Sequence, residues 1–149
     1  MNIIQNSGMV VTSDIGDLNS IHPPEKIEIG NRLAYWALNK TYNIKNVVPS
    51  GPIVESYNID ENKVEINFKY ASTGFYQFNG PLKDFEIAGN DGVFYKANAK
   101  ISGLKIIVES ADVKEPKMLR YGWKNYFEST LFNIDKLPAS SFFIRDLSK

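Results

Sequence analysis

Two hydrophobic patterns follow one another along the chain, and the change falls near residue 50. In the second part, Val64, Ile66 and Phe68 alternate with polar residues at a period of two, which is typical of a strand with one buried face. Similar apolar segments, separated by turn residues, are Phe85–Ile87, Val93–Tyr95, Ala99–Ile101, Leu104–Val108 and Met118–Trp123. This spacing predicts an antiparallel β-sandwich or jelly roll over residues 49–149, with a loop and a last strand in the tail.

The first part, residues 1–48, has the pattern of one strand–loop–helix unit. The run Met9–Thr12 is short, apolar and β-branched, which predicts a buried strand. Residues 13–23 are rich in Asp, Gly, Asn and Ser and predict a loop. Pro24 suits the first turn of a helix, and we expect this helix to end near Tyr42.

The expected helix has one apolar face at 3.6-residue spacing. Its members are Ile29, Leu33, Ala34, Trp36, Ala37, Leu38 and Thr41. Gly30 lies on the same side, where a missing side chain lets a helix approach a sheet closely. Strand, loop and packing helix form the repeating unit of an α/β domain, but one such unit cannot form a sheet by itself. We therefore expect it to dock either on the rest of an α/β domain or on the β-rich second part.

The composition argues against several classes of protein. Of 149 residues, 43% are apolar and 23% charged, and 17 basic residues balance 17 acidic ones. This balance does not favour nucleic-acid binding, and no apolar run approaches the roughly 20 residues that a membrane-spanning helix needs. With no cysteine and one histidine, we expect no disulfide, no thiolate nucleophile, no structural zinc site and no cofactor. The N-terminal residues show no signal-peptide pattern.

His22 is the only histidine, and its loop also holds Asp14 and Asp17. Imidazole is the usual side chain for proton transfer near neutral pH, and a loop carboxylate can hold it in one tautomer. The positive end of a helix disfavours the imidazolium, which keeps the neutral base available. The alternative is structural: a histidine that packs or caps, and aspartates that bond nearby backbone amides. The spacing does not rank Asp14 against Asp17.

A second candidate is an aromatic group that could stack on sugars, although aromatic side chains of β-domains more often belong to the core. The group comprises Phe75, Tyr76, Tyr121, Trp123, Tyr126 and Phe127. Tyr121 and Trp123 alternate with their neighbours along a strand, so we expect both to point inward. The Asp- and Asn-rich turns do not repeat the ligand spacing of an EF-hand, which favours solvated turns over calcium sites.

Several of these segments together resemble the C-terminal part of the sialate O-acetylesterase family, a group of SGNH-type carbohydrate esterases. The similarity runs in order through nearly the whole chain. The matching segments are Gly8–Thr12, Asp14–Asp17, Asn19–Pro23, Gly30, Arg32–Ala34, Ser50–Pro52, Phe85–Gly89, Ala97–Ile101, Arg120–Trp123 and Leu137–Ser140. Each motif is weak by itself, and their common order makes the resemblance specific.

The resemblance implies a serine esterase that removes O-acetyl groups from sugars, typically sialic acid. Acetylated xylan is the alternative substrate, because a fold does not fix a substrate. In such enzymes a serine attacks the acetyl carbonyl, a histidine takes its proton, and an oxyanion hole holds the developing charge. His22 corresponds to the family's catalytic histidine. Many members carry the acid of the triad three residues before the histidine, and in this chain that position is Asn19. Asp17 or Asp14 therefore supplies the carboxylate, or the serine and histidine act as a dyad without an acid, and the sequence leaves these alternatives open.

The family's serine and oxyanion-hole blocks lie upstream of the matching segments. We therefore expect the chain to be a fragment that is inactive alone, with the remainder of the hydrolase domain as its partner and an O-acetylated sugar as the substrate of the complete enzyme. The family implies a periplasmic or secreted parent enzyme. A different hypothesis is a non-catalytic accessory module, whose β-region binds carbohydrate or stabilises a partner domain.

Overall fold

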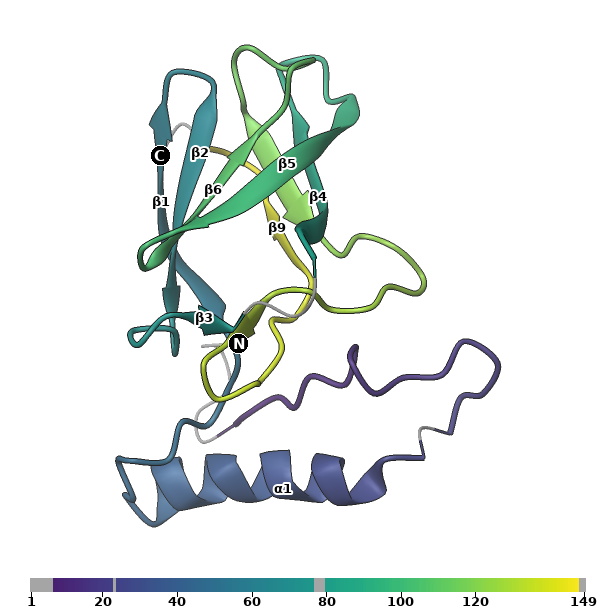
Figure 1. Ribbon diagram of the computed structural model, residues 1–149, viewed down its shortest axis with the longest axis vertical. Coiled ribbons are helices and arrows are strands. Elements are labelled where there is room, and N and C mark those ends of the chain that lie inside the picture. Colours follow the sequence, from purple (N-terminus) through teal and green to yellow (C-terminus); the bar gives the residue numbers. More distant parts are fainter. Residues whose placement is uncertain (1–6, 23, 77–79, 148–149) are drawn as a thin grey trace.

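The computed structural model describes residues 7–22, 24–76 and 80–147, and it confirms a mostly β chain with one helical segment (Figure 1). The helical segment consists of α1 (Lys26–Trp36) and a π-helical turn, η1 (Ala37–Thr41). The strands assigned among the described residues are β1 (Ile53–Asp60), β2 (Lys63–Lys69), β3 (Phe75–Tyr76), β4 (Leu82–Ala88), β5 (Phe94–Ser102), β6 (Lys105–Glu109), β7 (Met118–Tyr121), β8 (Phe132–Asn133) and β9 (Phe142–Ile144).

One antiparallel sheet dominates the β-rich part, in the strand order β1-β2-β6-β5-β4-β7-β9, while β3 and β8 form a separate pair. Tight turns join β1 to β2 and β5 to β6, and Glu61 and Gly103 adopt positive φ there. The sheet curls strongly (Figure 1). Strands that are distant in the sheet order therefore meet across the interior, where the ring of Phe68 in β2 lies 5.9 Å from that of Phe142 in β9.

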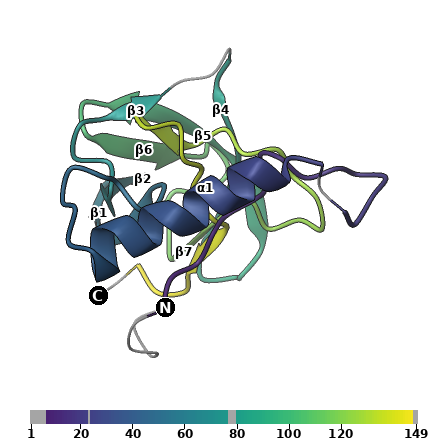
Figure 2. The same ribbon diagram turned by 90° about the horizontal axis from the view of Figure 1, so that it is seen from below.

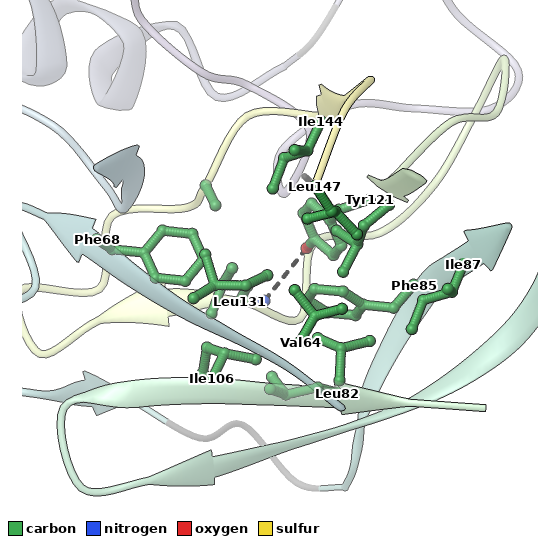
Figure 3. Packing of buried hydrophobic residues seen from close by; sticks show 14 of the residues in the cluster. Val64, Phe68, Leu82, Phe85, Ile87, Ile106, Tyr121, Leu131, Ile144 and Leu147 are labelled. Atoms are coloured by element: carbon green, nitrogen blue, oxygen red, sulfur yellow. Dashed lines mark hydrogen bonds between the residues drawn. The ribbon is translucent and has the colours of Figure 1, made fainter. Parts of the chain in front are cut away.

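The hydrophobic core fills the inside of this curled sheet (Figure 3). Alternation in β2 is confirmed, since Val64, Ile66 and Phe68 are buried and the residues between them are only partly covered. Tyr121 lies at the centre of the core, with its ring 4.7 Å from that of Phe85. The period-two pattern therefore predicted the buried face correctly.

The strand predictions differ from the structure in their number and bounds. Val93–Tyr95 and Ala99–Ile101, expected as two strands, belong largely to the single strand β5. Strand β1 was not predicted, and a bulge between Val54 and Ser56 interrupts its alternation. The strands β3 and β8 have two residues each and are too short to carry a periodic signal. The last strand expected in the tail is confirmed as β9.

Tyr121 and Trp123 do not share one orientation. The prediction that Tyr121 points inward is confirmed, but it is wrong for Trp123, which is 50% exposed. Strand β7 ends at Tyr121, and Gly122 adopts a φ of 61°, so the alternation stops before Trp123. A β-carbon at Gly122 would also lie 2.5 Å from the ring of Phe127, which explains why a glycine stands there.

The helix forms close to its expected bounds, whereas the strand expected at Met9–Thr12 does not. This segment runs extended between α1 and the β-rich part (Figures 1 and 2), and no strand pairs with it among the described residues. Strand formation requires neighbours for the backbone donors and acceptors. Here side chains of α1 replace them: the carbonyl of Val11 accepts a hydrogen bond from Arg32, and that of Met9 accepts one from the indole of Trp36.

The apolar face expected on the helix is only partly covered. Leu33 is 58% exposed, Ala34 is exposed, and a β-carbon added at Gly30 would contact nothing within 4 Å. The side that meets the rest of the chain carries the buried Arg32 and the half-buried Trp36 instead. Of the two docking alternatives, the β-rich part is therefore not the partner of the Leu33–Ala34 face.

Candidate active site

His22 lies on an exposed loop that projects past the N-terminal end of α1 (Figure 2). Its backbone N–H donates to Oγ of Ser20 at 3.1 Å, which closes a small turn within the loop. The described residues offer the imidazole ring no hydrogen bond, and Ile21 beside it is 90% exposed. The loop therefore presents the ring outward, with both ring nitrogens open to a partner.

Asp17 organises the turn that precedes His22. Its Oδ1 accepts a hydrogen bond from the backbone N–H of Asn19 at 2.8 Å, and its carbonyl accepts one from the N–H of Ser20 at 3.4 Å. Aspartate at the start of a turn commonly does this. Asp17 is exposed, and its Oδ2 has no partner among the residues that the structure describes. The structure thus brings Asp17 and His22 onto one short loop without a direct bond between them.

Asp14 has a different environment, because both of its carboxylate oxygens bind Arg32. Nη1 of Arg32 donates to Oδ1 at 2.7 Å, and Nη2 donates to Oδ2 at 2.6 Å. The same guanidinium also donates to the carbonyl of Val11 at 2.6 Å and to Glu28 at 3.0 Å. Arg32 therefore connects the middle of α1 to the segment on which the His22 loop begins.

The Arg32–Asp14 pair is largely removed from water, with 6% of the arginine side chain and 15% of the aspartate side chain exposed. Burial by itself lowers the pKa of Arg32, but the hydrogen bonds and charges of Asp14 and Glu28 outweigh it, so the pKa lies above its ordinary value. The guanidinium stays charged, and a buried charge requires its carboxylate partner. The sequence pattern did not predict this role for Arg32. The sequence does place Arg32 among the apolar helix positions Ile29 and Trp36. A charge on a buried face needs a partner, so this position could have indicated an ion pair.

The loop after β7 packs against the segment that carries the candidate residues. Oγ of Ser13 and Oγ of Ser129 lie 2.5 Å apart in a hydrogen bond, although 116 residues separate them in the chain. Gly16 lies close to the ring of Tyr126, which a β-carbon at Gly16 would approach within 4.0 Å. The β-rich part therefore contributes residues 126–129 to the surroundings of the His22 loop (Figure 1).

The junction expected between residues 48 and 49 is firmly held. Residues 49–52 are buried, and the side-chain amide of Asn133 donates to the carbonyls of Ser50 and Tyr70, at 3.0 and 2.8 Å. Oδ1 of Asn133 accepts the N–H of Leu137 at 2.9 Å. The role of Asn133 was not predicted from the sequence, because an Asn-Ile-Asp turn gives no sign of a buried amide. The N-terminal part of the chain, which carries the His22 loop and α1, thus connects to the β-rich part through an ordered, buried segment.

Among the described residues, no group of three or more His, Asp or Glu side chains lies close enough together to hold a metal ion. No helix in these residues has the length and apolar character required to cross a bilayer. The candidate site consists of the exposed His22 on a loop that also carries the carboxylates of Asp14 and Asp17.

Comparison with solved structures shows what the chain is similar to. A solved structure described as a carbohydrate acetylesterase from Xanthomonas citri superposes with a TM-score of 0.81 and 34% sequence identity. The match covers 88% of this chain but 31% of that chain, so this chain spans about a third of its length. No profile of a known protein family and no curated protein matches the chain. The chain is thus similar to part of a carbohydrate esterase.

Proposed function

We propose that this chain is the C-terminal part of a carbohydrate O-acetylesterase and supplies its catalytic histidine. The observation that carries the proposal is the 34% identity, over 88% of the chain, to a carbohydrate acetylesterase. The exposed imidazole of His22 agrees with it, because a base must reach a proton on a group outside its own loop.

In the proposed reaction, His22 takes the proton of a serine hydroxyl as that serine attacks the acetyl carbonyl, and the ester bond to the sugar breaks as the imidazolium returns this proton to the departing sugar oxygen. Water, which gives a proton to the same imidazole, then attacks the acetyl-serine, and the proton returns to the serine as acetate leaves. The serine and the oxyanion hole belong to the remainder of the hydrolase domain. Asp17 is the better candidate for the carboxylate that orients the imidazole, because both oxygens of Asp14 already bind Arg32. A serine–histidine dyad without an acid is the alternative. We assign Asp14 the structural role of fixing the loop.

The remainder of the hydrolase domain is also the proposed partner of the uncovered apolar surface. Ile21, Ile27 and Leu33 are all more than half exposed, and all three lie on the loop of His22 or on α1. Burying each of these side chains contributes about 1.5–3 kcal/mol. A domain that covers them would also exclude water around His22, which strengthens electrostatic interactions during catalysis.

We propose an O-acetylated sialic acid as the substrate of the complete enzyme, with acetylated xylan as the alternative. Release of acetate from an O-acetylated sialoside and from acetylated xylan distinguishes the two. The purified chain alone is expected to release no acetate from either substrate or from p-nitrophenyl acetate. Turnover that disappears in His22→Ala would show that this chain holds its own nucleophile and would contradict the proposal.

A chimaera tests the role of His22 directly. The segment of the Xanthomonas citri esterase that matches this chain is replaced by this chain, and acetate release is measured. We expect His22→Ala to lower kcat at least about 1,000-fold, while the fold, checked by circular dichroism, stays unchanged. Among chimaeras that remain folded, Asp17→Asn should lower kcat more than Asp14→Asn does. Full activity of a folded His22→Ala chimaera would contradict the assignment of His22 as the catalytic base.

A second candidate function, a carbohydrate-binding accessory module, is favoured by one specific observation. The half-exposed indole of Trp123 lies beside a polar recess on the outside of the sheet.

A further inference from the structure

Trp123 lies at the end of a row of aromatic rings on the outer side of the sheet. Its ring is 5.4 Å from that of Phe143, which in turn is 5.8 Å from the ring of Phe94. Arginines cover the other parts of this row: the guanidinium of Arg120 lies 3.9 Å above Phe94, and that of Arg145 lies 5.4 Å from Phe143. The indole of Trp123 is the member of the row that is half exposed. Neighbouring rings therefore hold it in place while solvent reaches it.

A recess opens beside this indole, lined by Gly122, Trp123, Lys124, Asn125 and Ser141. Lys124 pairs with Asp84, whereas the amide of Asn125 and the hydroxyl of Ser141 have no hydrogen-bond partner among the described residues. Both side chains are exposed. The recess thus combines one apolar wall with free donors and acceptors, the combination that orients a small polar ligand.

Backbone geometry, and not core packing, gives Trp123 this position. The positive φ of Gly122 turns the chain after the buried Tyr121, and the ring of Phe127 occupies the space beside Gly122. The indole points outward although a continued strand would bury it. Held against Phe143, the half-exposed indole offers a flat apolar face beside the recess.

We propose that Trp123 and the recess form a glycan-binding subsite that receives a pyranose ring of an oligosaccharide. The C–H face of a pyranose carries partial positive charge and packs on the electron-rich face of an indole. Its hydroxyls both donate and accept, which matches the amide of Asn125, the hydroxyl of Ser141 and the ammonium of Lys124. The subsite requires no catalytic serine, so it can exist whether or not the esterase proposal holds.

Calorimetric titration of the purified chain tests the subsite with three probes: xylohexaose, cellohexaose and sialyllactose. We expect binding of at least one probe. Trp123→Ala should weaken it about tenfold or more, since an aromatic anchor in a binding site commonly carries that much affinity. Asn125→Ala should weaken it about threefold to tenfold through one lost hydrogen bond, with no effect on aromatic packing. Tyr42→Ala is the control, because Tyr42 is an exposed aromatic residue at the end of η1, and it should bind like the wild type.

Loss of affinity in Trp123→Ala and Asn125→Ala, with Tyr42→Ala unchanged and all variants folded by circular dichroism, supports the subsite. Absence of binding by the folded wild-type chain to all three probes overturns it, as does binding that neither Trp123→Ala nor Asn125→Ala weakens. Acetate release is measured separately from glycan binding. A failed binding experiment therefore does not contradict the esterase proposal, and a failed acetate assay does not contradict the subsite.

Discussion

Arg32 and Asp14 form a two-pronged ion pair, with N–O distances of 2.7 and 2.6 Å, between the middle of α1 and the start of the His22 loop. Such a fork fixes orientation as well as distance, because a planar guanidinium meets a planar carboxylate along two parallel hydrogen bonds. The pair holds the first half of the loop. The second half, which contains His22, is exposed.

Replacement of Arg32 by methionine should therefore loosen the whole N-terminal unit. The largely covered carboxylate of Asp14 loses its partner, which costs about 3 kcal/mol. We expect faster hydrogen exchange at backbone amides of residues 9–17 and unchanged exchange in β2 and β6. The double variant Arg32→Met with Asp14→Leu should recover part of the loss, since no buried charge remains unpaired.

Lys105→Met provides the matched control. Nζ of Lys105 lies 2.7 Å from a carboxylate oxygen of Glu65, but 45% of the lysine side chain is exposed. An exposed pair contributes about 1 kcal/mol or less. If Arg32→Met disturbs the chain no more than Lys105→Met does, the Arg32–Asp14 pair does not organise the loop.

The sequence predicted the β-rich part because its determinants are local. Alternation in β2 and β6 places apolar residues on one face, and burial of that face is sufficient to select the strand. The prediction that Trp123 points inward was wrong because a single positive φ at Gly122 ends the alternation. Glycine permits such a conformation without requiring it, so the turn could not be read from the residue alone.

The candidate site depends on long-range contacts that periodicity does not encode. The expectation of a strand at Met9–Thr12 rested on its apolar, β-branched residues, but strand formation also requires a neighbouring edge. The role of Arg32 depends on a carboxylate 18 residues away, and that of Ser13 on a hydroxyl 116 residues away. His22 was singled out from sequence because residue chemistry alone, a single histidine in an Asp-rich loop, indicated it, and its catalytic role stays a prediction.

Gly51 and Gly30 should respond in opposite directions to alanine. A β-carbon at Gly51 would lie 2.0 Å from the carbonyl oxygen of Pro138, whereas one at Gly30 would meet nothing within 4 Å. Gly51→Ala must displace backbone and should cost about 3 kcal/mol of unfolding free energy. Gly30→Ala should stabilise the helix by about 1 kcal/mol, because alanine has the higher helix propensity. Urea denaturation of both variants measures the two effects.

Gly30→Ala also tests the proposed docking surface. In the chimaera described above, the added methyl group stands on the face that we propose meets the hydrolase domain, so acetate release should fall although the isolated chain is more stable. Equal activity of the wild-type and Gly30→Ala chimaeras would argue against close packing at this face.

Asn133→Asp should destabilise the junction between the two parts of the chain. Asn133 is fully buried, and its amide nitrogen donates to the carbonyls of Ser50 and Tyr70. An aspartate would place carboxylate oxygen against those two carbonyls, with both hydrogen bonds lost, at a cost of about 3 kcal/mol. Asn58→Asp on the exposed side of β1 is the control and should change the midpoint of urea denaturation little. Similar midpoints for the two variants would contradict the role of Asn133.

Tyr121 should make the stability of the chain depend on pH in the alkaline range. Burial raises the pKa of Tyr121 above its ordinary value of about 10, although the backbone N–H groups of Thr130 and Leu131 partly lower it. Above pH 10 the unfolded chain loses the phenol proton while the folded chain keeps it. The unfolded state then binds fewer protons, so the free energy of unfolding falls as pH rises from about 10 towards the folded-state pKa. Below pH 10 the contribution is fully present.

Comparison of the wild type with Tyr121→Phe isolates this effect from the titration of lysines. At pH 7 the variant should be about 1–2 kcal/mol less stable, because the two N–H groups lose their acceptor in the core. Phenylalanine cannot ionise, so this difference should shrink as pH rises above about 10. Tyr42→Phe, at an exposed position, is the control and should be about as stable as the wild type at pH 7. A difference between wild type and Tyr121→Phe that stays constant from pH 7 to pH 11 would show that ionisation of Tyr121 is not linked to unfolding.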